Sequence, residues 1–128
     1  MAVSAQFNAF VLDLLGSVRR VTARHMFGGV GYYAEGVFFA IADDDVLYFR
    51  VDDASRAHFE NEGMQAFAPM GPGTKSMNYY SVPARLYDDE EQMAVWMRRA
   101  LAAAHSGGLK RPGRSVRARV GGRSRPGG

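Results

Sequence analysis

Three short apolar runs with a two-residue periodicity lie close together in the first half of the chain, and their spacing restricts the fold more than any other feature. The runs cover residues 30–33, 37–42 and 46–51 and are rich in β-branched and aromatic residues. Short strands joined by tight polar turns form antiparallel hairpins, so the sequence predicts a three-stranded antiparallel meander. The two predicted turns are Ala34-Glu35-Gly36 and Asp43-Asp44-Asp45.

The second and third runs differ in how their side chains alternate. In the third run Leu47, Phe49 and Val51 share one face, while Tyr48 and Arg50 share the other, a pattern typical of a half-solvated strand. The second run is apolar on both faces, so both faces are expected to be covered. A helix of the same chain or a partner subunit would provide that cover.

A helical pattern precedes the meander. Apolar residues recur there at the spacing of a single helical face and predict a first helix over about 4–18, with Ser4 as its N-cap. Arg19 and Arg20 suit the carboxyl end of this helix, where cations are favoured. The predicted apolar face consists of Phe7, Phe10, Val11, Leu14, Leu15 and Val18.

A helix, two strands and a helical turn are predicted after the meander. Asp52 or Asp53 is predicted to cap a short helix that runs to about Glu62, and Gly63 is a suitable residue to end it. The next predicted elements are strands at 64–68 and 76–81, followed by a helical turn that opens at Pro83.

A last helix is predicted to begin at Asp88 as N-cap, with Glu91 at the capping-box position. Its apolar face consists of Met93, Trp96, Met97, Ala100, Leu101 and Ala104. The predicted element order is α-β-β-β-α-β-β-α, an α+β fold with an antiparallel sheet.

The composition changes after His105 and divides the chain into a predicted folded domain, 1–105, and a basic flexible tail, 106–128. The domain holds 9 Lys and Arg against 13 Asp and Glu, a net charge of −4, whereas the tail holds seven cations and no acid. These cations could neutralise phosphates and bind nucleic acid without reading its sequence, or they could serve only solubility. They are Lys110, Arg111, Arg114, Arg117, Arg119, Arg123 and Arg125.

The stretch from Gly29 to Ala34 matches G-x-G-x-x-A, one form of the dinucleotide-binding fingerprint. That fingerprint needs a helix directly after it, because the pyrophosphate binds at the helix N-terminus. Here the pattern continues as strand, turn and strand. We therefore interpret the glycines as positions that permit a bulge or a close backbone approach, and we expect no helix to begin after them before Asp52.

The acidic and histidine residues predict no metal site. The chain has no cysteine, and the three consecutive acids at 43–45 lack the ligand spacing of a calcium-binding loop. We expect a solvated turn there. His25, His58 and His105 show no pairing typical of metal ligands.

No pattern predicts a catalytic centre or a cofactor site either. No serine lies in a G-x-S-x-G setting, and Tyr79 and Tyr80 should face opposite sides of their strand, one in the core and one toward solvent. We therefore predict a non-enzymatic protein without cofactor or metal. The alternative is a small-ligand-binding domain or an unrecognised enzyme, using a cleft where Met26–Gly31 meets Lys75–Tyr80. No segment predicts a secretion signal or a membrane span, so a cytoplasmic location is expected.

Three ordered motifs resemble the TfoX/Sxy amino-terminal domain family. The family pattern Met-Phe-Gly-Gly-x-Gly lies at Met26–Gly31, an approximate Ala-Asp-Asp-x-Leu-Tyr motif at 44–48, and Met-Ser-Tyr-Tyr-x-Val-Pro at Met77–Pro83, with Asn78 replacing the serine. The resemblance extends from about residue 8 to residue 104. Its motif positions include Met26, Phe27, Gly28, Gly29, Gly31, Met77, Tyr79, Tyr80 and Pro83.

This resemblance implies a TfoX-N-like, secretion-chaperone-like fold and kinship with regulators of natural competence, which act as co-activators beside a cyclic-AMP-responsive regulator. It brings no catalytic residue. It implies a protein partner, either a transcription regulator or a second copy of the chain, and a homodimer is expected. The two-domain members of the family continue into a second domain, whereas this chain continues into a basic segment of 23 residues.

Overall fold

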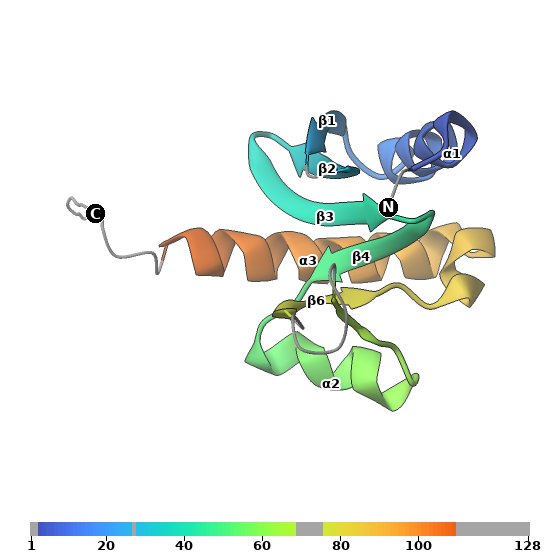
Figure 1. Ribbon diagram of the computed structural model, residues 1–128. Helices are drawn as coiled ribbons and strands as arrows, with labels where there is room; N and C mark the ends of the chain where they lie inside the picture. The colour runs from blue at the N-terminus through green and yellow to red at the C-terminus, as the bar shows by residue number, and fades with distance from the viewer. Residues whose placement is uncertain (1–2, 27, 69–75, 110–128) are drawn as a thin grey trace.

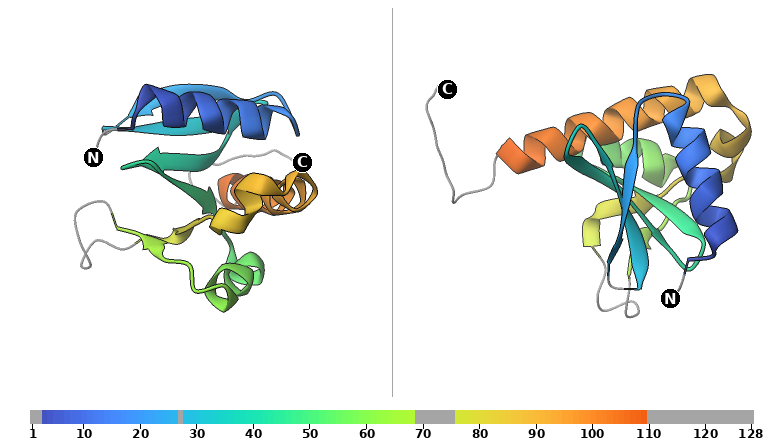
Figure 2. Two further views of the ribbon diagram at one scale, coloured as in Figure 1. Left: turned by 90° about the vertical axis from the view of Figure 1, so that its right-hand side faces the viewer. Right: turned by 90° about the horizontal axis from the view of Figure 1, so that it is seen from above.

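The computed structural model describes residues 3–26, 28–68 and 76–109. It contains a six-stranded antiparallel sheet in the order β1-β2-β3-β4-β6-β5, with helices packed against one side (Figures 1 and 2). The α+β class is therefore confirmed. The strands are β1 (Thr22–Met26), β2 (Gly29–Ala34), β3 (Val37–Asp43), β4 (Val46–Arg50), β5 (Ala66–Phe67) and β6 (Ser76–Ser81). The helices are α1 (Ala5–Gly16), α2 (Asp53–Asn61), the 3-10 helix η2 (Ala84–Asp88) and α3 (Glu90–Leu109).

The predicted meander is confirmed in strands β2 to β4, and its two turns explain the tight connections. Asp44 and Asp45 both have left-handed backbones, with φ of 53° and 59°. Glu35 and Gly36 are also left-handed, with φ of 52° and 80°. Two consecutive left-handed residues form the type I′ turn, whose twist matches that of the strands it joins.

A strand that the predicted order did not contain, β1, pairs antiparallel with β2 at the edge of the sheet. Its residues, Thr22-Ala23-Arg24-His25-Met26, are exposed or half-buried. The strand buries no complete side chain, so it carries no apolar alternation by which it could be recognised. Its pairing depends on the neighbouring strand rather than on its own composition.

The core lies between the sheet and the helices α1, α2 and α3. Helix α3 crosses one side of the sheet and packs on β3 and β4 (Figure 2). The predicted helical faces are largely confirmed, except that Phe10 remains 41% exposed and that Phe7, Val18 and Leu101 are only half-buried. The largest fully buried side chains are Tyr32, Phe39, Phe49, Phe59, Leu15, Leu47, Leu86, Met93, Met97, Val11, Val30 and Val51.

A bulge in β3 alters the alternation predicted for that strand. Tyr32 pairs with Ala40 while Tyr33 pairs with Phe38, so the register shifts by one residue at Phe39. Phe39 and Ala40 are consecutive, yet both are fully buried. A bulge lets two neighbours turn toward the same side. Phe39 therefore joins the core, where its ring lies 6.0 Å from that of Phe49.

The caps of the helices agree with the sequence at two of three positions. Ser4 accepts a hydrogen bond from the Phe7 amide, and Asp52 caps α2. The predicted N-cap of the last helix, Asp88, was wrong. η2 extends through Asp88, so Asp89 occupies the cap position instead and accepts the Gln92 amide at 3.1 Å. Helix α3 also continues to Leu109, past the predicted domain boundary at 105.

Candidate interaction face

The glycines of the Met26–Gly31 motif serve the backbone. Gly28 is left-handed, with φ of 81°, and Gly29 and Gly31 lie in β2. A Cβ atom on Gly29 would lie 2.5 Å from the Ala42 carbonyl oxygen. A Cβ on Gly31 would lie 2.6 Å from Cε of Met26 and 2.9 Å from Cε1 of Phe38. These distances leave room only for hydrogen.

The glycine segment is not a phosphate-binding loop. Among the residues that the structure describes from 28 onward, the first helix after the glycines is α2, which begins at Asp53. Strands β2 and β3 follow the glycines directly, so no helix N-terminus faces them. The prediction of a strand or bulge is confirmed for Gly29 and Gly31, which lie in β2, whereas Gly28 lies in the turn before it.

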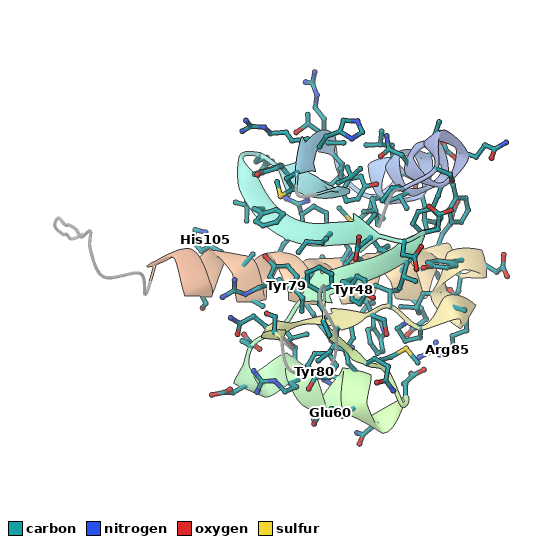
Figure 3. The ribbon with its side chains drawn as sticks, viewed as in Figure 1. Tyr48, Glu60, Tyr79, Tyr80, Arg85 and His105 are labelled. Carbon is teal, nitrogen blue, oxygen red and sulfur yellow. The ribbon has the colours of Figure 1, made fainter. Side chains whose placement is uncertain are left out.

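The side of the sheet opposite α3 carries a row of aromatic side chains, here called the aromatic face. Its five rings come from the five strands β2 to β6. Tyr33 stacks on Phe38 with centroids 5.1 Å apart, and Phe38 lies 5.9 Å from Tyr79. Tyr48 and Tyr79, labelled in Figure 3, belong to the paired strands β4 and β6. The aromatic face consists of Tyr33, Phe38, Tyr48, Phe67 and Tyr79.

The exposure of the aromatic face is intermediate. Tyr33, Phe38, Tyr48 and Phe67 are half-buried, whereas Tyr79 is buried. No described helix packs on this side of the sheet (Figure 2). The rings therefore shield one another while each keeps part of its surface accessible.

Arg50 covers the centre of the aromatic face. Its guanidinium carbon lies 5.6 Å from the centroid of the Tyr79 ring, within the range of a cation–π contact. Burial raises the pKa of the Tyr79 hydroxyl above its ordinary value of about 10. Strands β4 and β5 flank β6, and the rings of Tyr48 on β4 and Phe67 on β5 lie 4.8 Å apart.

Tyr79 and Tyr80 face opposite sides of β6, as predicted. Tyr80 lies in the core and its hydroxyl donates to Oε2 of Glu60 at 2.9 Å, beside α2 (Figure 3). One of the two was expected to face solvent, but Arg50 and Phe38 cover Tyr79. The two hydroxyls thus lie on opposite sides of the sheet and form no joint acid–base pair.

The two stretches predicted to form a cleft, Met26–Gly31 and Lys75–Tyr80, do not lie on adjacent strands in the described part of the sheet. The first stretch leads into β2 and the second into β6, and strands β3 and β4 separate them in the sheet. The Met26 side chain also fills the space above Gly31. Phe27 and Lys75 lie outside the described residues.

A small cavity of about 180 Å³ lies beside the end of β4. Asn78, from the second of the two predicted stretches, contributes to its wall, and Nε of Arg50 is buried without a hydrogen-bond partner among the described residues. Arg56 on α2 also lines the cavity and pairs with Asp53 at 2.9 Å. The cavity is lined by Arg50, Val51, Asp52, Asp53, Arg56, Asn78, Ala103 and Ser106.

The remaining predicted residues are dispersed. His25, His58 and His105 are exposed on β1, α2 and α3. Within residues 3–26, 28–68 and 76–109, no three His, Asp or Glu side chains are placed to hold a metal ion. No helix in these ranges is both long and apolar enough to cross a bilayer. The seven cations of the basic tail lie outside the described residues.

The sequence indicated part of the aromatic face. The alternation at 46–51 placed Tyr48 and Arg50 together on the side away from the core, and β4 confirms this. Phe38, Phe67 and Tyr33 were not singled out. Their association with Tyr48 and Tyr79 depends on the strand order, which places β6 beside β4, and no local pattern specifies that pairing.

Comparison with known proteins gives one family. The family model described as the TfoX N-terminal domain matches residues 13–104, the stretch that holds β1 to β6 and most of α3. The match contains all three motifs singled out in the sequence. None of the curated proteins compared with the chain matches it.

Proposed function

The chain belongs to the TfoX N-terminal domain family, and from this membership we propose that it is a regulatory adaptor domain that acts through a protein partner. The proposed role lies in transcription or competence regulation in the cytoplasm, without catalysis and without a cofactor. The partner is a transcription regulator or a second copy of the chain. The basic tail contributes a second contact, to nucleic acid.

The aromatic face is the observation that best supports an adaptor role. Tyrosine, phenylalanine and arginine are enriched in protein–protein interfaces, where aromatic rings supply large contact areas at low entropic cost. Tyr48 and Phe67 stand beside Arg50 on a side of the sheet that no described helix covers. A partner that covered these rings would bury their remaining exposed surface.

The contact with nucleic acid is proposed from the sequence of the tail alone. Its seven cations and absence of acids match a segment that neutralises backbone phosphates. No aromatic residue is present to stack on bases, so the contact would be insensitive to sequence and weakened by salt.

Capture experiments with matched variants test the adaptor role. We would compare the full-length protein with Tyr48→Ser/Phe67→Ser and with His58→Ser, which removes an exposed ring from α2. The wild type and the His58 variant should retain the same specific partner, or the same dimer in sizing chromatography, while the double variant loses it. Retention of the partner by the folded double variant would contradict the proposed role of the aromatic face.

A nuclease control separates the two contacts. A partner that is lost after nuclease treatment is held through nucleic acid, whereas a partner that stays is held by protein contacts. DNA affinity should decrease as salt increases, and neutralising the seven cations should reduce it by orders of magnitude. Equal affinity of the neutralised chain would refute the nucleic-acid contact.

A second candidate function is the binding of a small ligand in the cavity beside Arg50. The unpartnered Nε of Arg50 supports it, because an unsatisfied buried donor costs about 1–3 kcal/mol. The cavity volume of about 180 Å³ lies below the range of about 300–1,000 Å³ for drug-sized ligands. Only a small molecule such as a short carboxylic acid would fit. A rise in melting temperature with such acids in the wild type, absent in Arg50→Gln, would support this function; no rise with any of them would contradict it.

A further inference from the structure

Three segments distant in sequence meet at one end of the molecule, here called the acidic end. The Ser4 amide donates to Oδ1 of Asp45 at 2.8 Å, which fixes the start of α1 beside the β3–β4 turn. The Phe10 ring lies edge-on to the Tyr87 ring with centroids 5.5 Å apart, which joins α1 to η2. Figure 1 shows these parts together at the right of the view, where α3 also begins.

The acidic end combines apolar surface with negative charge. Phe10 and Val46 are the exposed large hydrophobic side chains among the described residues, at 41% and 37% exposure, and both belong to the meeting segments. The segments 3–18, 41–49 and 86–97 contain no lysine or arginine. They hold eight of the 13 acids of the chain: Asp13, Asp43, Asp44, Asp45, Asp88, Asp89, Glu90 and Glu91.

The opposite sign of charge follows α3 in the sequence. This helix has 20 residues, so it carries the chain about 30 Å away from the acidic end. After Leu109 come seven cations in 110–128, together with Val116 and Val120 and without any acid. The same chain therefore holds acidic segments with two exposed apolar side chains and a cationic segment with interspersed aliphatic side chains.

From this complementarity we propose that the segment 110–128 docks on the acidic end of its own molecule. The 19 residues can extend to about 60 Å, twice the length of α3, so the segment can return along the helix. Covalent linkage gives it an effective concentration that a free cationic peptide does not reach. The arginines pair with the exposed carboxylates of Asp13 and Asp88, and a valine covers Phe10.

Docking would also regulate the proposed contact with nucleic acid, and this consequence rests on that proposed function. Cations that pair with carboxylates cannot neutralise phosphates at the same time. Loss of acids at the acidic end should therefore release the segment and strengthen DNA binding.

Paramagnetic broadening in the full-length protein tests the docking. Because the chain has no cysteine, Ser115→Cys provides a unique site for a nitroxide label within the cationic segment. The amides of Val46, Asp88 and Glu90 should broaden when the label is oxidised. The labelled protein is diluted into unlabelled protein, so that broadening between molecules disappears and broadening within one molecule remains.

Two variants with equal change in charge separate docking from general electrostatics. Asp13→Asn/Asp88→Asn should restore the broadened signals, as should about 1 M NaCl, where the Debye length is about 3 Å. Glu35→Gln/Asp53→Asn, which neutralises two exposed acids elsewhere, should leave the broadening intact. Absence of broadening, its loss on dilution, or an equal effect of both variants would overturn the proposal.

DNA binding by the same two variants gives the second measurement. Each exposed ion pair contributes about 0.2–1 kcal/mol, so the Asp13/Asp88 variant should bind DNA about two- to thirtyfold more tightly than wild type. The Glu35/Asp53 variant should differ less. If broadening behaves as expected while neither variant nor wild type binds DNA, docking stands and the nucleic-acid contact is wrong. If broadening fails while DNA binding persists, only the docking is wrong.

Discussion

Replacing Gly29 by alanine should destabilise the sheet. The new Cβ would lie 2.5 Å from the carbonyl oxygen of Ala42, a backbone atom of the adjacent strand β3. Ordinary contacts between carbon and a carbonyl oxygen measure about 3.3–3.6 Å. Strand β2 or β3 would have to move by about 0.8 Å, and neither can move alone because the two strands are paired.

The expected magnitude follows from two opposing effects. Glycine within a strand costs about 0.5–1 kcal/mol relative to alanine, so the substitution gains that amount from the unfolded chain. Forcing an extra carbon into a packed region typically costs about 1–3 kcal/mol, and a backbone neighbour places this site at the upper end. We therefore expect a net loss of about 1–2 kcal/mol in the free energy of unfolding.

Two further glycines provide graded controls. Gly16, the last residue of α1, has no left-handed φ, and a Cβ added to it would meet nothing within 4 Å. Gly16→Ala should therefore stabilise the protein by up to about 1 kcal/mol. Gly31→Ala should cost less than Gly29→Ala, because its contacts are the end of the Met26 side chain and a ring edge.

Denaturant unfolding monitored by circular dichroism measures all three variants against wild type. The expected order of stability is Gly16→Ala, wild type, Gly31→Ala and Gly29→Ala, with a few degrees of melting temperature for each kcal/mol. A Gly29→Ala protein at least as stable as wild type would refute the close-approach explanation of this glycine.

Three other predictions concern the core and its ionisable groups. Phe59→Ala should cost about 3–5 kcal/mol in unfolding free energy, because the Phe59 ring is buried and lies 4.7 Å from that of Trp96. Phe10→Ala at the surface should cost far less, and equal losses would contradict the burial pattern. Helix amides lower the pKa of Asp52 below its ordinary value of about 4, so the stabilisation by this cap is complete above that pH and is lost as pH falls through the lower folded value. Asp52→Ala should be about 1 kcal/mol less stable at neutral pH, and its acid unfolding should lack the pH dependence that the cap causes. Burial raises the pKa of Tyr32 to about 12, so unfolding free energy should decrease as pH rises from about 10 to about 12, and Tyr32→Phe should flatten that part of the stability curve.

The meander and the helical faces could be predicted because their signals are local. Left-handed turn residues at Glu35-Gly36 and Asp44-Asp45 stand between apolar runs, and nothing elsewhere in the chain has to be known to interpret them. The cap of α2 at Asp52 is local in the same sense. The start of the last helix was harder to predict because Asp88 and Asp89 are both suitable caps, and the extent of η2 before them determines which one caps the helix.

The aromatic face depends on contacts between distant segments that no local sequence pattern indicates. Phe38 contacts Tyr79 only because β4 pairs with β6, although α2 and β5 lie between these two strands in the sequence. The bulge at Phe39 is equally non-local, since it adjusts β3 to strand β2 and to the ring of Phe49. Strand β1 was missed because its polar residues bury little surface at the edge of the sheet.

The strand order also determines which parts of the sheet form early in folding and which form late. Strands β1, β2 and β3 each pair with the next strand in the chain, and hairpins of this kind form in about 1–10 μs. The pairing of β4 with β6 joins Phe49 to Tyr80 and must close a loop that contains α2. Such closure lowers chain entropy before any contact compensates it. We expect the transition state for folding to contain a formed β1–β4 meander and an incomplete β6, so the aromatic face is completed late.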